Sequence, residues 1–263
     1  MKRILTALLL VPIGVYAALF APWWIFFTVV GLFACLCFRE YARITGTFAP
    51  LGFAAGLLLL IAPPDRIAIV VSLTVLACMC LPLAAPDPEK AVLRTGTLLL
   101  GILYIFGAWK TAILLRDVNQ PPLHFLTAGR HWLMFALMVN WIGDTGAYYA
   151  GRSFGRNKLA PAISPGKTWE GAVASALTAI VFGQIYLPLA ITGTSLLKAG
   201  LLALAANVAG QAGDLAESAI KRGAGVKDSG TLLPGHGGML DRVDSTLFAL
   251  PVLYALVTLL HIS

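Results

Sequence analysis

Long apolar stretches follow one another along most of the chain, separated by short segments rich in glycine, proline or charged residues. A helix needs about 20 mostly apolar residues to cross the ~30 Å hydrocarbon core of a bilayer. Nine stretches approach that length: Ile4–Phe20, Trp23–Phe38, Pro50–Ala62, Ile67–Ala84, Thr97–Leu115, Trp132–Gly151, Glu170–Ala190, Leu196–Gly213 and Val243–His261. The pattern predicts an all-α, polytopic membrane bundle of about nine transmembrane helices. The third stretch is short enough to be re-entrant instead.

Composition supports a membrane location. Of the 263 residues, 59% are hydrophobic and 12% are charged, about half the charged share of a soluble domain. Such a chain lacks the polar residues to cover its surface in water, and no soluble second domain is visible. We divide the chain into N-terminal transmembrane helices, residues 1–130, and a C-terminal transmembrane region, residues 131–263. We expect the latter to carry a catalytic, cytoplasm-facing polar site.

Lysine and arginine orient the predicted bundle, because cytoplasmic loops are enriched in both. With the N-terminus inside, fourteen of them fall on the inside and four, namely Arg66, Arg116, Arg130 and Lys198, on the outside. Lys110 falls within a span, from which we expect it to snorkel outward. This bias predicts a cytoplasmic N-terminus in a bacterial inner membrane. Topology and attraction to anionic headgroups then account for the net charge of +7, so no nucleic-acid partner is expected.

Acidic residues are placed less evenly than basic ones. Seven of the twelve lie after residue 140, all on the predicted inside face or at inner ends of spans: Asp144, Glu170, Asp214, Glu217, Asp228, Asp241 and Asp244. The positive-inside rule explains basic residues there but not acids. We therefore expect this face to hold a cation.

Asp144 lies in the segment N-W-I-G-D-T-G-A-Y-Y, within an apolar span and several residues before its inner end. A carboxylate at that depth costs a few kcal/mol unless it is paired or binds a metal, which makes it a candidate functional residue. The alternative is an ion pair with a nearby lysine or arginine that only locks two helices together.

The segment 151–170 joins two spans on the inside face. Ser164–Gly166 is interpreted as a turn, and Thr168–Glu170 as the start of the next helix. A turn that leads into a helix N-terminus offers free backbone N–H groups and a positive dipole end to a phosphate, and Lys167 adds a positive charge. An ordinary basic loop that only sets topology explains this segment equally well.

Two further segments carry polar residues in helical or loop patterns. Asp214, Glu217, Ser218 and Lys221 recur three and four residues apart, so they share one helix face. This indicates a wet cleft, although a solvated helix end would look similar.

The glycine-rich segment that follows surrounds His236, and its glycines allow the backbone to approach a ligand closely. Asp241 and Asp244 then open the last span, three residues apart, so that both can face one metal. Oxygen ligands with no cysteine cluster nearby favour Mg²⁺ over zinc, and Mg²⁺ usually takes one or two carboxylates plus substrate phosphates. Acids, glycines and basic residues together indicate phosphoryl or nucleotidyl transfer.

The stretch S-A-I-K-R-G-A-G-V-K-D-S-G-T-L-L-P-G-H-G-G-M-L-D-R-V-D, Ser218 to Asp244, resembles the characteristic motif of the phosphatidate cytidylyltransferases, or CDP-diacylglycerol synthases. The resemblance extends upstream to W-I-G-D-T-G-A-Y and S-P-G-K-T-W-E-G, so it covers about residues 140–245. In the second of these, Gly166 stands where members usually have a lysine. The N-terminal half matches only in being a stack of apolar spans.

This resemblance implies that CTP and phosphatidate react to give CDP-diacylglycerol and pyrophosphate, a step of phospholipid biosynthesis. It implies Mg²⁺ as the cofactor, allows K⁺ as a second cation, and suggests a homodimer surrounded by membrane lipid. We assign catalytic roles to Asp144, Lys167, Asp214, Asp241 and Asp244, with the four aspartates as metal ligands. Substrate-binding roles are assigned to Glu170, Ser218, Lys221, Arg222, Lys227, Asp228, His236, Gly237, Gly238 and Arg242.

Two alternatives remain open at this point. A CTP-dependent polyprenol kinase would also use a membrane-embedded nucleotide site, but it would release CDP. A cation transporter would use Asp144 and Asp214 as its ion pathway, which leaves the Gly-His-Gly-Gly loop and the basic residues around it unexplained.

Overall fold

The computed structural model describes residues 2–84, 88–118, 126–233, 235 and 237–260. Most of these residues are helical, as the sequence predicts. The α-helices are α1 (Lys2–Leu19), α2 (Trp23–Thr45), α3 (Ala49–Ile61), α4 (Ile67–Cys80), α5 (Ala91–Gly101), α6 (Ala108–Arg116), α7 (Ala128–Phe154), α8 (Trp169–Ala190), α9 (Leu196–Gly223) and α10 (Leu240–Leu259). Short 3-10 helices are η1 (Pro64–Arg66), η2 (Leu81–Ala84) and η3 (Pro88–Lys90), and a π-helix, η4 (Ile102–Gly107), joins α5 to α6.

Within the described residues, six helical segments are long and apolar enough to cross a membrane. They are Trp23–Thr45, Pro64–Leu83, Ala91–Arg116, Trp169–Ala190, Leu196–Gly223 and Leu240–Leu259. The protein is therefore a multi-pass membrane protein. Helix α3 has only 13 residues, about 20 Å of helix, which agrees with the short third stretch in the sequence.

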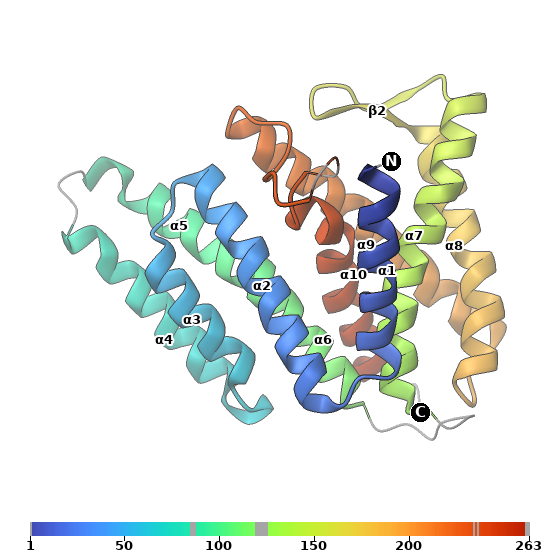
Figure 1. Cartoon of the computed structure of the whole chain (residues 1–263), viewed down its shortest axis with the longest axis horizontal. Helices are drawn as coiled ribbons and strands as arrows, with labels where there is room; N and C mark the ends of the chain where they lie inside the picture. Colours follow the sequence, from blue (N-terminus) through green and yellow to red (C-terminus); the bar gives the residue numbers. More distant parts are fainter. Residues whose placement is uncertain (1, 85–87, 119–125, 234, 236, 261–263) are drawn as a thin grey trace.

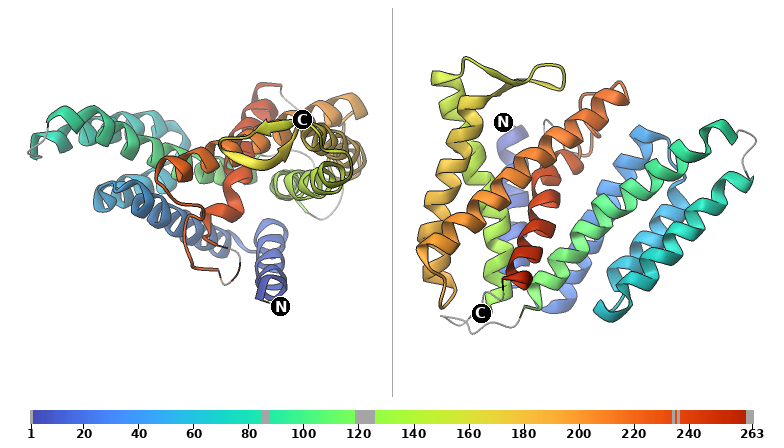
Figure 2. Two further views of the ribbon diagram at one scale, coloured as in Figure 1. Left: turned by 90° about the horizontal axis from the view of Figure 1, so that it is seen from above. Right: turned by 180° about the vertical axis from the view of Figure 1, so that it is seen from behind.

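Successive long helices run in alternating directions, so that α1 begins and α10 ends at opposite ends of the molecule (Figure 1). The C-terminal helices form the more tightly packed part: α7 contacts α8, α8 contacts α9, and α9 contacts α10. Helix α1 lies against α7, while α2 to α5 extend to one side (Figure 2). The loops that precede α8 and α10 lie at the same end of the bundle as the start of α1 (Figure 1).

The segment before α8 differs from the prediction. Residues 164–166 were interpreted as a turn, but Ser164–Thr168 forms strand β2, which pairs antiparallel with β1 (Lys158–Ala160). The helix start was predicted correctly: Thr168 is the N-cap, and its Oγ1 accepts a hydrogen bond from the Gly171 amide at 3.2 Å. Strand pairing across a short loop satisfies backbone N–H and C=O groups of this polar segment.

The prediction that Lys110 snorkels outward is wrong. Its side chain is buried, and the ammonium donates to the carbonyl oxygens of Leu60 and Ala62, at 2.9 Å and 2.5 Å. Both carbonyls belong to the C-terminal end of α3, which carries unpaired acceptors and a partial negative charge. Lys110 therefore binds the end of a neighbouring helix instead of reaching water.

Two arginines hold the C-terminal end of α1 in the same manner. Arg116 is buried and donates to the carbonyls of Ala17 and Ala21, and Arg130 donates to the Leu19 carbonyl at 2.7 Å. These contacts attach α1 to α6 and α7, and α1 forms one wall of the cavity described next.

Candidate active site

Two cavities lie side by side among the C-terminal helices, and Asp144 and Asp214 line both. The first, of about 530 Å³, lies between α1, α2, α6, α7, α9 and α10. The second, of about 470 Å³, lies between α7, the β-hairpin, α8 and α9. The sequence places these two aspartates seventy residues apart, and the packing of α7 against α9 brings them to one shared wall.

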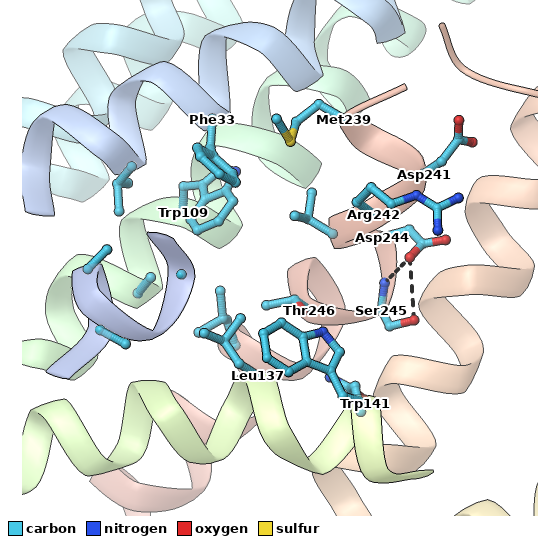
Figure 3. Close-up of a pocket in the computed structure, with 18 of the residues that line it drawn as sticks. Phe33, Trp109, Leu137, Trp141, Met239, Asp241, Arg242, Asp244, Ser245 and Thr246 are labelled. Carbon is cyan, nitrogen blue, oxygen red and sulfur yellow. Dashed lines mark hydrogen bonds between the residues drawn. The ribbon is translucent and has the colours of Figure 1, made fainter. Parts of the chain in front are cut away.

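The first cavity has a polar end and an apolar end. Its charged lining residues are Asp144, Asp214, Lys221, Asp228, Asp241, Arg242 and Asp244. Figure 3 shows three of these on α10, across the cavity from the apolar side chains of Phe33, Trp109 and Leu137. Five acidic and two basic side chains therefore line the first cavity. Because acidic side chains are in excess, its polar end attracts cations.

Asp214 is held from two sides. Its Oδ2 lies 2.7 Å from the Lys167 ammonium, which reaches over from β2, and its Oδ1 accepts from the Ser218 hydroxyl at 3.3 Å. The carboxylate of Asp144 interacts electrostatically with both Lys167 and Asp214. The alternative interpretation was that Asp144 only forms an ion pair with a basic residue. Lys167 is the basic residue near it, but the ammonium of Lys167 forms its direct ion pair with Asp214.

A buried ion triad lies one turn further along α9. The Lys221 ammonium lies 2.6 Å from the Glu217 carboxylate and 2.5 Å from Asp241. Glu217 is 1% exposed and Lys221 is 9% exposed. The lysine was predicted to contact a substrate phosphate. In the structure two carboxylates already engage its charge, which joins α9 to α10.

Asp241 also organises the loop before α10. Besides Lys221, it accepts hydrogen bonds from the backbone amides of Ser229, at 3.0 Å, and Gly238, at 2.8 Å. Gly237 has a φ of +84°, and a Cβ there would lie 2.6 Å from the Asp241 carboxylate. The glycine at this position thus lets the loop fold over the aspartate. Metal binding by Asp241, as predicted from the sequence, would have to displace one of these donors.

Asp244 lies on the wall of the first cavity, where its Oδ1 accepts from the Ser245 amide at 2.7 Å (Figure 3). Its electrostatic neighbours include Asp214 and Glu217 on α9. Gly213 makes this approach possible, because a Cβ there would lie 2.8 Å from the Asp244 carbonyl oxygen. Close packing of α9 on α10 therefore places Asp244 beside Asp214.

The remaining predicted substrate-binding residues are dispersed. Arg242 and Asp228 line the first cavity. Lys227 is exposed and lines neither cavity. Arg222 donates to the carbonyls of Ile163 and Val226, so it ties the end of α9 to the hairpin. His236 lies outside the described residues, so its predicted role is not addressed.

Glu170 was predicted to bind substrate, but it lines neither cavity. Its carboxylate accepts hydrogen bonds from the Asn157 side chain, at 2.9 Å, and from the Asn157 amide. These contacts fix the start of the hairpin relative to α8. Glu170 therefore positions the segment that carries Lys167.

Sequence reasoning missed three polar residues of the site. Arg152 and Gln211 line the second cavity. Glu40, on α2, is 8% exposed and accepts hydrogen bonds from the loop before α10. Asp144 was identified as an acid within an apolar span, whereas Glu40 follows the predicted second span, Trp23–Phe38, by two residues and so did not carry that signal.

Mg²⁺ was predicted, and the donor set can be compared with its chemistry. Among the described residues, no three His, Cys, Asp or Glu side chains converge as a ready-made metal cage. Mg²⁺ usually binds through one or two carboxylates together with substrate phosphates, so it does not require such a cage. The adjacent carboxylates of Asp144, Asp214 and Asp244 on an acidic cavity wall fit that mode of binding.

These features define a multi-pass helical membrane protein with a charged two-cavity site at one end of its C-terminal helices. A model of the cytidylyltransferase family matches residues 1–260. Phosphatidate cytidylyltransferase of Pseudomonas aeruginosa is 36% identical to the chain, over 97% of this chain and 96% of that protein. The chain belongs to the cytidylyltransferase family.

Two other relatives bear the same name. Phosphatidate cytidylyltransferase of Bacillus subtilis is 42% identical over 63% of this chain, and that of Haemophilus influenzae is 37% identical over 62%. The matched region spans 59% of the length of each of these two relatives.

Proposed function

We propose that the protein transfers the cytidylyl group of CTP to phosphatidate, giving CDP-diacylglycerol and pyrophosphate. The observation that carries the proposal is the wall shared by the two cavities, where Asp144 and Asp214 border both. A transferase that joins a lipid to a nucleotide needs two substrate sites that meet at the reacting atoms. One cavity with an apolar end and one cavity with a basic hairpin satisfy that need.

The first cavity suits the lipid. Its apolar lining residues include Val11, Ala17, Ala18, Phe26, Val30, Phe33, Trp109, Leu133, Leu137 and Trp141. Phosphatidate tails already lie in hydrocarbon, so this apolar surface replaces contacts with lipid and not with water, and the tails stay in an apolar environment. A phosphatidate molecule would place part of its tails there and its phosphate at the polar end, near Arg242.

The second cavity suits the nucleotide. Lys167 and Arg152 line it together with the Gln211 amide, and the aspartates form its inner wall. Gly166 also lines it, with nothing within 4 Å of a Cβ built there. Arg152 on α7 and Lys167 on β2 are suited to a triphosphate, because each can approach phosphate oxygens from a different side.

In the proposed reaction, a phosphate oxygen of phosphatidate attacks the α-phosphorus of CTP. A new P–O–P bond forms, the bond between the α-phosphorus and the β-phosphate oxygen breaks, and pyrophosphate leaves. The protein positions two polyanions and offsets their repulsion, and it needs no nucleophilic side chain because phosphatidate supplies one. Lys167 would neutralise charge that accumulates on the leaving pyrophosphate.

We propose Mg²⁺ as the cofactor, held by Asp144, Asp214 and Asp244 together with nucleotide phosphates. When bound, it would supply positive charge that offsets the repulsion between these carboxylates and the phosphates. K⁺ as a second cation is part of the same proposal. Asp241, which engages Lys221 and two backbone amides, is assigned here to holding the loop before α10.

We further propose nine membrane crossings with the N-terminus in the cytoplasm, in the inner membrane of a bacterium. The alternating helix directions support this count when α3 is included and α5, η4 and α6 are taken as one span (Figure 1). The division at residue 130 and a homodimer in the membrane remain predictions that accompany this orientation.

The function is tested with purified protein in mixed micelles that contain phosphatidate, CTP and Mg²⁺. We expect CDP-diacylglycerol and pyrophosphate in equal amounts. Absence of product, together with cation flux when the same preparation is placed in liposomes, would support the transporter instead.

A further inference from the structure

Glu40 forms an extensive contact between the N-terminal half of the chain and the site. Its carboxylate accepts three hydrogen bonds: from the Ser229 hydroxyl at 3.0 Å, the Met239 amide at 2.9 Å and the Leu240 amide at 2.8 Å. The residues it binds lie 189 to 200 positions away in the sequence. Glu40 is 8% exposed and Ser229 is 2% exposed, so the contact is inside the protein.

The loop is shaped to receive this carboxylate. A Cβ at Gly230 would lie 2.7 Å from Glu40 Oε1, and one at Gly238 would lie 2.4 Å from Oε2. Side chains at either position would push the carboxylate away from its donors. The loop thus approaches Glu40 by its backbone on two sides.

The contact falls at the first turn of α10, where backbone amides have no partners within the helix. Met239 is the N-cap residue of that helix, and Leu240 is its first residue. A carboxylate there satisfies two of these amides and interacts favourably with the positive end of the helix dipole. In α10 this carboxylate comes from another helix, α2, and not from the N-cap residue.

Glu40 and Asp241 together hold both ends of the loop. Ser229 donates its hydroxyl to Glu40 and its amide to Asp241, while Gly238 donates its amide to Asp241 and its neighbour Met239 donates to Glu40. The start of α10, and with it the direction in which its acidic side chains point, is therefore set by α2 as well as by α9.

We propose that Glu40 is a positioning residue for the transfer reaction: it fixes the start of α10 so that Asp244 and Arg242 face the substrate cavity. This inference rests on the proposed function. Glu40 itself is absent from the linings of both substrate cavities. Its effect on turnover passes through the loop and α10. It also ties α2, in the N-terminal half of the chain, to the start of α10.

The test is Glu40→Gln, with Glu89→Gln as the matched control, because Glu89 is an exposed carboxylate in the same half of the chain. A glutamine presents an N–H₂ group where an acceptor is required, so one backbone amide of α10 loses its partner. Residues that hold metal ligands in place are typically worth about 10- to 100-fold in activity. We expect kcat to fall by about that factor and the Mg²⁺ concentration for half-maximal activity to rise, with Glu89→Gln unchanged in both.

A second readout does not depend on activity. Hydrogen–deuterium exchange in the peptide that covers residues 229–240 should accelerate in Glu40→Gln, while exchange in α8 stays as in the unmodified protein. A folded Glu40→Gln protein with unchanged kcat, Mg²⁺ dependence and loop exchange would overturn the inference.

Ser229→Ala provides the same test if Glu40→Gln does not fold, since it removes only the hydroxyl donor. We expect a smaller loss of turnover and a similar shift in Mg²⁺ dependence, and normal behaviour in both would contradict the inference. Inactivity of the unmodified protein with CTP and phosphatidate would refute the proposed function. The loop exchange experiment would still report whether Glu40 holds the loop.

Discussion

Replacing Lys167 with methionine separates a phosphate-binding role from a structural one. The Lys167 side chain is 26% exposed and Asp214 is 34% exposed, with 2.7 Å between ammonium and carboxylate. An ion pair so open to solvent contributes about 0–1 kcal/mol to folding. The thermal midpoint of the protein should therefore change little on Lys167→Met.

The expected effect on catalysis is larger. A phosphate oxygen about 4 Å from the ammonium would gain about 4 kcal/mol at an effective dielectric constant of 20. Since each 1.36 kcal/mol of barrier is about a factor of ten in rate, the upper bound on the loss is about 10³-fold. Other cations that also contact the CTP phosphates, such as Arg152, reduce the expected loss below this upper bound. We expect a fall of about 10- to 10³-fold in kcat/KM for CTP.

The assay measures release of pyrophosphate over a range of CTP concentrations at saturating phosphatidate and Mg²⁺. Lys158→Met is the matched control, because Lys158 lies on the partner strand of the same hairpin, is exposed and lines neither cavity. It should behave as the unmodified protein. Equal, small effects of the two substitutions would refute the reasoning, because Lys167 would then contribute no more than general positive charge on the hairpin.

Four further substitutions test other parts of the structure. Asp144→Asn should remove most turnover at an unchanged thermal midpoint. Asp241→Asn should also destabilise the protein, by about 1–3 kcal/mol, because the buried Lys221 ammonium loses one of its two carboxylate partners and keeps Glu217. A normal thermal midpoint for Asp241→Asn would contradict the triad. Gly166→Lys should fold normally, because a Cβ there meets nothing within 4 Å, and should lower the KM for CTP; a raised KM would show that the added cation does not face the nucleotide. Lys110→Met should cost about 1–3 kcal/mol in stability without altering KM, because it leaves carbonyls at the end of α3 unpaired, and an unchanged thermal midpoint would refute that.

Helix positions could be read from the sequence because each depends on a local property, namely a run of apolar residues long enough to cross lipid. The shared face of Asp214, Ser218 and Lys221 was predicted for the same reason, since helical spacing alone brings them together. The structure confirms it: Ser218 donates to Asp214, and Lys221 pairs with Glu217, one turn before it.

Contacts between segments that are distant in the sequence could not be predicted from local patterns. The length and polarity of Lys110 indicate a snorkelling side chain, and only the packing of α6 against α3 reveals the carbonyls that it binds. Likewise, Asp241 appears in the sequence as a metal ligand, and its partner Lys221 becomes visible only once α9 and α10 are side by side. Glu40 was overlooked because its donors lie nearly two hundred residues away.

The central claim is that a cytidylyl group, and not a terminal phosphate, passes to the lipid. It is tested most directly by incubating the purified protein, phosphatidate and Mg²⁺ with CTP labelled at either the α- or the γ-phosphorus, and then extracting the lipid. We predict that the α-label enters the lipid and the γ-label leaves in pyrophosphate. Entry of the γ-label into lipid, with release of CDP, would contradict the account and identify a kinase.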